Sequence, residues 1–141
     1  MVTTTPNSVT VRIDGKDVTK SGNLSKFDAI PAGSLEQECE NLVDLESFNE
    51  GIILHHIRNR FNKQAIYTFV GSILIALNPY KKVDIYGVPI MDATMTKLKS
   101  GDVLPPHVYS IGATALYNLR TEGKDQAVLI SGIILELRIF V

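Results

Sequence analysis

Two groups of residues in this 141-residue chain carry side chains that could bind a metal or move protons. His55 and His56 are adjacent. Because neighbouring positions on a helix point to different faces, we expect them to pack or face solvent rather than share a metal. The second group is an acidic face formed by Glu36, Glu38 and Glu40. No second catalytic group is paired with it, which argues against general acid–base chemistry. The sequence also contains no nucleophile elbow, zincin motif or dinucleotide fingerprint, so it predicts neither a catalytic residue nor a metal site.

Basic side chains gather near position 60, where Arg58, Arg60 and Lys63 flank Phe61. Such a group suits either a nucleic-acid contact or the solvated end of a helix. The helix end is favoured because no wider basic patch accompanies it. The chain has 14 basic and 15 acidic residues, a formal net charge of -1, which gives no overall attraction to nucleic acid or anionic lipid. We therefore expect no nucleic-acid partner.

Cysteine content and hydropathy bear on the compartment. Cys39 is the only cysteine, so an internal disulfide and a cysteine-based zinc site are excluded, and a reducing compartment is the natural interpretation. Residues 1–14 lack the basic start and apolar core of a signal peptide. The apolar stretch 69–77 is far shorter than the ~18–20 residues that a membrane helix needs. We expect a soluble, cytoplasmic chain without a membrane span.

A further pattern is Asn78-Pro79 followed, after six residues, by Tyr86. By itself this pattern is typical of a turn that ends a strand, because proline cannot donate a hydrogen bond to a sheet. Its meaning depends on the elements around it. With 45% hydrophobic and 21% charged residues, the chain has the composition of one globular domain at most.

The elements before this pattern are a β-rich lead-in and then a helix. Residues 9–13 alternate apolar and polar side chains as a half-buried strand does, Asp14-Gly15 suits a hairpin turn, and Val18 begins a return strand. Either Ser47, at capping-box spacing from Glu50, or Asn49 caps a helix that ends near residues 62–63. Its apolar stripe is predicted to be Leu54, Ile57 and Phe61.

The elements around and after the pattern alternate between strands and helices. Residues 66–77 predict a strand covered on both faces, with a bulge or tight bend at Gly71-Ser72. Residues 91–98 suggest a short helix, and a longer one opens at Pro106 and stops at Gly123. Residues 127–131 predict a short buried strand. The stripe of the longer helix is expected at Val108, Ile111, Ala115 and Leu119.

Taken together, three segments resemble the N-terminal part of a myosin motor domain: residues 49–61, Asn78-Pro79-x6-Tyr86, and P-H-V-Y-S-I with Gln126–Gly132. The resemblance covers about residues 42–132. It implies a mixed α+β and α/β fold, the N-terminal part of a P-loop motor head with a partial transducer sheet and covering helices. We divide the chain into a lead-in, 1–34, similar to the end of an SH3-like barrel, a motor-head part, 35–132, and a divergent apolar tail, 133–141.

The resemblance also implies a function. In myosins the N-P-x6-Y segment is the purine-binding loop, so Asn78, Pro79 and Tyr86 would edge the adenine of ATP, with Lys81 and Lys82 near the ribose. A rigid Asn-Pro turn, a flat phenol and nearby cations suit such a ligand. Membership of the family further implies ATP and Mg²⁺ as cofactors, actin filaments as partner, and a cytoskeletal location.

The sequence departs from the family where the phosphate-binding loop, G-x4-G-K-[ST], should follow. Gly132 is a remnant of it, but Leu137, Arg138 and Ile139 stand where the second glycine, the lysine and the Ser/Thr belong. Bulky, β-branched residues do not readily form the glycine-rich anion cradle. We therefore expect weak nucleotide binding at most and no ATP turnover by this chain.

Two interpretations of this ending stay open. The abrupt departure after Gly132 suggests a shortened product of a longer gene, and a natural short C-terminal strand is the alternative. The function is correspondingly either that of a motor-head fragment or that of a non-catalytic interaction module. In the second case, an exposed sheet edge would favour self-association.

Overall fold

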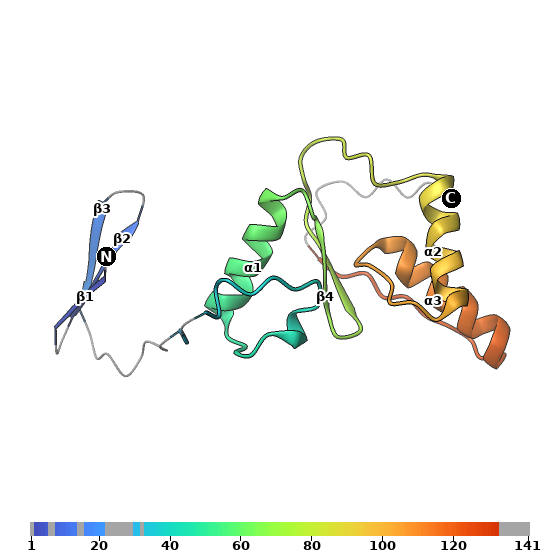
Figure 1. Ribbon diagram of the computed structural model, residues 1–141, viewed down its shortest axis with the longest axis horizontal. Helices are drawn as coiled ribbons and strands as arrows, with labels where there is room; N and C mark the ends of the chain where they lie inside the picture. Colours follow the sequence, from blue (N-terminus) through green and yellow to red (C-terminus); the bar gives the residue numbers. More distant parts are fainter. Residues whose placement is uncertain (1, 6–7, 14–15, 22–29, 32, 133–141) are drawn as a thin grey trace.

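A computed structural model describes residues 2–5, 8–13, 16–21, 30–31 and 33–132 (Figure 1). The described residues combine helices and strands, which confirms the predicted mixed α and β character. In chain order the elements are β1 (Val2–Thr5), β2 (Ser8–Ile13), β3 (Lys16–Ser21), the 3-10 helix η2 (Leu42–Asp44), α1 (Glu50–Asn62), β4 (Tyr67–Val70), β5 (Ile73–Ala76), α2 (Val88–Ser100) and α3 (Val108–Glu122).

The lead-in forms a three-stranded antiparallel sheet with β2 in the centre. Val11 of β2 is paired with Val18 of β3 on one side and with Val2 of β1 on the other. The strand predicted at residues 9–13 and its return strand are thereby confirmed. The first strand was not predicted, and the turn at Asp14-Gly15 lies outside the described residues.

Helix α1 begins after Asn49, whose Oδ1 accepts the N–H of Ile52 at 3.0 Å, so Asn49 rather than Ser47 is the cap. It ends at Asn62, as predicted. The buried face, however, carries Ile52 and His56, which are 0% and 4% exposed, whereas Leu54 is 65% exposed. Of the predicted stripe, Ile57 packs against the core, whereas Leu54 and Phe61 are exposed. Ile52 packs in the core with Leu42 and Leu45 from the preceding segment, and that segment selects the face.

Strands β4 and β5 form an antiparallel hairpin in which Val70 pairs with Ile73. The expectation of one continuous strand over residues 66–77 is wrong, and the alternative of a tight bend at Gly71-Ser72 is confirmed. Gly71 has a φ of 60°, a conformation that glycine adopts without strain. Its N–H donates to the side-chain oxygen of Asn41 at 2.9 Å, which ties the turn to the segment before η2.

Helices α2 and α3 pack against each other after the hairpin (Figure 1). Helix α2 is longer than predicted, and α3 begins after His107 rather than at Pro106 because the His107 ring accepts the N–H of Tyr109. Gly123 ends α3 in the left-handed conformation, as predicted. Of the predicted stripe of α3, Ile111 and Ala115 are half-buried, whereas Val108 and Leu119 are exposed; the fully buried residues are Ser110 and Ala113.

Residues 127–131 do not form the strand that the sequence predicts. Within the described ranges they belong to no sheet, and Leu129 is 93% exposed. An apolar, β-branched run becomes a strand only when a neighbour supplies the other half of each hydrogen bond, and no described strand pairs with this segment. Separately, none of the described helices is both long and apolar enough to cross a membrane.

Candidate functional site

The loop of residues 78–87 leaves β5 through a turn that its own side chains fix. The Oδ1 of Asn78 accepts the N–H of Tyr80 at 2.8 Å, an Asx turn closed around Pro79. Tyr80 itself has a φ of 51°, unusual for a residue other than glycine. The start of the loop is thus held in one conformation.

The end of the 78–87 loop is held by two tyrosine hydroxyls from distant parts of the sequence. Tyr86 Oη lies 2.9 Å from Tyr67 Oη of β4, and the N–H of Gly87 donates to Tyr109 Oη of α3 at 3.1 Å. Gly87 has a φ of 118°, which favours glycine at this position. Both ends of the loop are therefore anchored.

His107 packs among these tyrosines, and together they form an aromatic cluster: Tyr67, Tyr86, His107 and Tyr109. The centroid of the His107 ring lies 5.0 Å from that of Tyr67, 5.5 Å from that of Tyr86 and 4.7 Å from that of Tyr109. Burial raises the pKa of Tyr67, and its hydrogen bond to Tyr86 raises it further. The phenol of Tyr67 therefore stays protonated at neutral pH and can share a hydrogen bond with the Tyr86 hydroxyl.

Residues of the 78–87 loop line two hollows at the surface of the molecule. One, of about 520 Å³, is lined by Pro79, Lys81, Lys82, Val83, Asp84, Tyr86 and Gly87. The other, of about 320 Å³, lies toward the end of α1 and is lined by Phe61, Asn62, Gln64, Ile66, Pro79, Lys81 and Val83. Lys82 and Asp84 approach to 3.9 Å with both side chains more than nine-tenths exposed, so this pair adds little stability and leaves the lysine available.

The structure brings five of the predicted site residues together on one loop: Asn78, Pro79, Lys81, Lys82 and Tyr86. The sixth, Gly132, is exposed, lines neither hollow and has open space around its Cα. Sequence reasoning missed Tyr67, His107 and Tyr109. Separations of about 20 to 40 residues hide such a cluster from any periodicity, and only the two aromatic rings in P-H-V-Y hinted at it.

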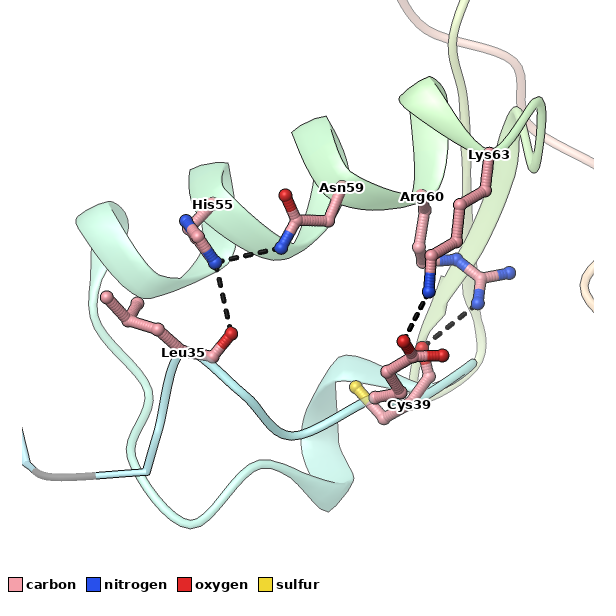
Figure 2. Close-up of polar contacts among 7 residues, drawn as sticks. Leu35, Cys39, His55, Asn59, Arg60 and Lys63 are labelled. Atoms are coloured by element: carbon pink, nitrogen blue, oxygen red, sulfur yellow. Dashed lines mark hydrogen bonds and ion pairs between the residues drawn. The ribbon is translucent and has the colours of Figure 1, made fainter.

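Arg60 links α1 to the segment before η2 and to the start of β4, and Figure 2 shows its contact with Cys39. Its guanidinium donates to the carbonyl oxygens of Cys39 and Tyr67 and to Thr68 Oγ1, each at 3.0 Å. The prediction that Arg60 belongs to a solvated helix end is wrong, because its side chain forms hydrogen bonds with Tyr67 and Thr68 at the start of β4. The neighbouring Lys63 does remain exposed, where it pairs with Glu38 and lowers the pKa of that carboxyl.

The two adjacent histidines are engaged by the segment before η2. His56 Nε2 is buried 2.8 Å from the carbonyl oxygen of Ser34. His55 Nε2 lies 3.1 Å from the carbonyl oxygen of Leu35 and 2.8 Å from Asn59 Nδ2 (Figure 2). The part of the chain that the structure describes contains no group of three or more His, Cys, Asp or Glu side chains able to hold a metal ion.

The burial of His107 predicts a pH-dependent stability. Burial lowers the pKa of His107 below its ordinary value of 6.5, and the main chain of Ile85 opposes this only in part. Between the two pKa values the unfolded chain binds more protons than the folded one, so the free energy of unfolding falls as the pH drops through about 6.5. We expect urea denaturation at pH 7.5, 6.5 and 5.5 to show this loss.

Replacing His107 isolates its contribution. In His107→Gln the slope of the free energy of unfolding against pH should flatten between pH 7.5 and 5.5. The pKa of Glu38 is lowered below its ordinary value of 4.5, so this carboxyl changes the free energy of unfolding only at lower pH. An equally steep slope in the variant would assign the pH dependence to another group.

Comparison with known proteins places these features in a family. Residues 39–133 match the family model of the myosin head (motor domain). The chain is 32% identical to the high molecular weight form of myosin-1 of Acanthamoeba castellanii, over 84% of this chain and 7% of that protein. It is 41% identical to the unconventional myosin heavy chain 6 of Caenorhabditis elegans, over 68% and 4%. It is also 39% identical to the unconventional myosin-Ic of Gallus gallus, over 66% and 9%.

These relatives are much longer proteins, and the chain spans less than a tenth of their length. The matched residues 39–133 nevertheless include α1 with Arg60, the β4–β5 hairpin, the 78–87 loop and the whole aromatic cluster. Because the match covers well over half of the sequence and every element of the site, this chain belongs to the myosin head (motor domain) family.

Proposed function

We propose that the 78–87 loop forms the base-side wall of a myosin nucleotide site, and that this chain alone neither retains the triphosphate nor hydrolyses it. The observation that carries the proposal is the loop itself. It is anchored at both ends, by the Asx turn at Asn78 and by the Tyr67–Tyr86 contact, over a hollow of about 520 Å³. A preformed, concave surface of this kind is where small ligands bind in proteins.

The chemistry of the wall suits a flat, electron-rich ring that carries a polyanion. Tyr86 is 46% exposed, so its phenol is available on one side while Tyr67 holds its hydroxyl. Lys81 and Lys82 line the same hollow and are exposed, so they attract phosphate as mobile point charges. Their attraction is screened by salt, because exposed charges interact through water.

The phosphate side of the site rests on the sequence after Ser131. Leu137, Arg138 and Ile139 replace the residues that cradle the phosphates and hold Mg²⁺ in the G-x4-G-K-[ST] loop. We propose that ATP, Mg²⁺, actin filaments and a cytoplasmic, cytoskeletal location belong to the motor that contains a complete head of this family. The contribution of this chain is then the wall alone.

A nucleoside titration tests the wall. We expect adenosine to shift the amide signals of residues 78–87 in heteronuclear NMR spectra, with a dissociation constant of about 1 mM or weaker, because only one side of the ligand is bound. Cytidine, with its smaller ring, is the matched control and should bind more weakly. Adenosine shifts confined to other residues, or none at 10 mM, would overturn the proposal.

A second function, self-association, is favoured by the exposed edge of the hairpin. Within the described residues no strand pairs with the outer edge of β5, and Ile73 at its start is 65% exposed. Unpaired edges are templates for strand addition, so a second copy of the chain is the proposed occupant. Sedimentation velocity from 10 to 300 μM decides: a concentration-dependent dimer supports this function, and a monomer throughout excludes it.

A further inference from the structure

The last two residues of the loop are each engaged by a different side chain from outside it. Tyr86 meets the hydroxyl of Tyr67, and the N–H of Gly87 donates to the hydroxyl of Tyr109. Consecutive residues are thus fixed from β4 and from the first turn of α3, elements separated by about 40 residues in sequence.

His107 holds the two tyrosines in a fixed relation to one another. It is 8% exposed, and its Nδ1 accepts the N–H of Tyr109 at 3.1 Å as the cap of α3. Its ring meets the rings of Tyr67 and Tyr109 edge-on, the preferred geometry for aromatic contacts. The Tyr67 and Tyr109 hydroxyls therefore present a rigid pair of contacts to the loop.

We propose that Tyr67 and Tyr109 are positioning residues, which set the orientation of Tyr86 and the position of Gly87 and thereby the fit of the base-side wall to adenine. This inference rests on the proposed function. Tyr86 is nearly half exposed, and without its hydroxyl contact its ring would sample more orientations. Binding would then have to restrict it, at a cost in affinity that preorganisation avoids.

Phenylalanine variants test the proposal because they remove one hydroxyl and keep the ring packing. In Tyr67→Phe and Tyr109→Phe we expect adenosine to bind about three- to tenfold more weakly, the effect of one lost hydrogen bond. Tyr117→Phe is the matched control, because Tyr117 lies on α3 with Tyr109 but outside the aromatic cluster. This variant should bind adenosine as the parent chain does. Urea midpoints close to that of the parent chain would separate positioning from a loss of fold.

A double-mutant cycle distinguishes positioning from a general structural role. If Tyr67 acts through Tyr86, Tyr67→Phe should have no further effect on adenosine binding in a Tyr86→Phe background. In Tyr109→Phe the amide of Gly87 should exchange with solvent about three- to tenfold faster, because its acceptor is gone.

The outcomes separate the two proposals. If the parent chain does not bind adenosine at the loop, the proposed function fails and this role fails with it. If the parent chain binds adenosine and both phenylalanine variants bind it equally well, the base-side wall stands and the positioning role is overturned. Effects of Tyr67→Phe that persist undiminished in the Tyr86→Phe background also overturn it.

Discussion

Arg60→Met is expected to destabilise the chain by about 2–4 kcal/mol, because it leaves three hydrogen-bond acceptors without their donor. Two are the carbonyl oxygens of Cys39 and Tyr67, and the third is the hydroxyl of Thr68, which is 2% exposed. Methionine fills a similar volume, so the loss reports the polar contacts rather than a cavity. The free energy of unfolding of a small domain is only about 5–15 kcal/mol. The urea midpoint should therefore fall markedly.

Two matched variants sharpen this expectation. Arg58→Met removes an exposed arginine from the same helix and should change the free energy of unfolding by less than about 0.5 kcal/mol. Arg60→Lys keeps the charge but lacks the planar fork that reaches three acceptors at once, so its loss should lie between the other two. If Arg60→Met and Arg58→Met unfold at the same urea concentration, the three hydrogen bonds contribute no net stability.

The consequence of losing Arg60 extends to the loop. Arg60 bonds the carbonyl oxygen of Tyr67, and the hydroxyl of the same residue meets Tyr86. Tyr67, at the start of β4, therefore takes part both in the packing of residues 39–68 and in the anchoring of the 78–87 loop. We infer that stability and site geometry are coupled through this one residue, and that core variants near Tyr67 will affect adenosine binding as well as folding.

Local signals explain what the sequence could predict. The end of α1, the return strand of the lead-in and the stop at Gly123 depend on a few adjacent residues, and each was predicted from them. The mixed α and β character followed from the alternating elements and from the resemblance, and the five site residues of the 78–87 loop, which the resemblance implied, stay a prediction. The sequence left the choice of cap and the bend at Gly71 as alternatives, and side-chain hydrogen bonds from Asn49 and Asn41 account for the outcome at each.

The wrong predictions share a different cause, since each depends on what packs from outside the element. Apolar residues in α1 fit two faces at helical spacing, and the segment around Leu42 and Leu45 covers the one with Ile52. Arg60 looks like a solvated cation until the carbonyls of Cys39 and Tyr67 are placed beside it. The run at residues 127–131 has strand composition without a described neighbour to pair with. Periodicity describes only the order of residue types along the chain. Which face is buried, which contacts a side chain makes and whether a strand forms depend on the segments that pack against it.

The largest expected effect concerns the phosphates of ATP. The glycine-rich loop of the family contributes about four charge-assisted hydrogen bonds, each stabilising by ~1.5–3 kcal/mol, so replacing it removes roughly 6–12 kcal/mol of binding free energy. That is four or more decades of affinity. We therefore expect ATP and adenosine to bind this chain with similar, low affinity in 0.3 M salt, and Mg²⁺ to make no difference there.

Calorimetric titration of adenosine, ATP and MgATP into the 141-residue chain measures this, with a phosphate-release assay beside it and a complete myosin head as the positive control. The two exposed lysines of the 78–87 loop should favour ATP over adenosine by severalfold at low salt, and this preference should vanish in 0.3 M salt because exposed charges are screened. A cradle for phosphates would behave differently, since its contacts are short and sheltered from solvent. Micromolar, magnesium-dependent binding of ATP, or phosphate release above the buffer rate, would therefore show that residues 132–141 hold phosphate despite Leu137, Arg138 and Ile139.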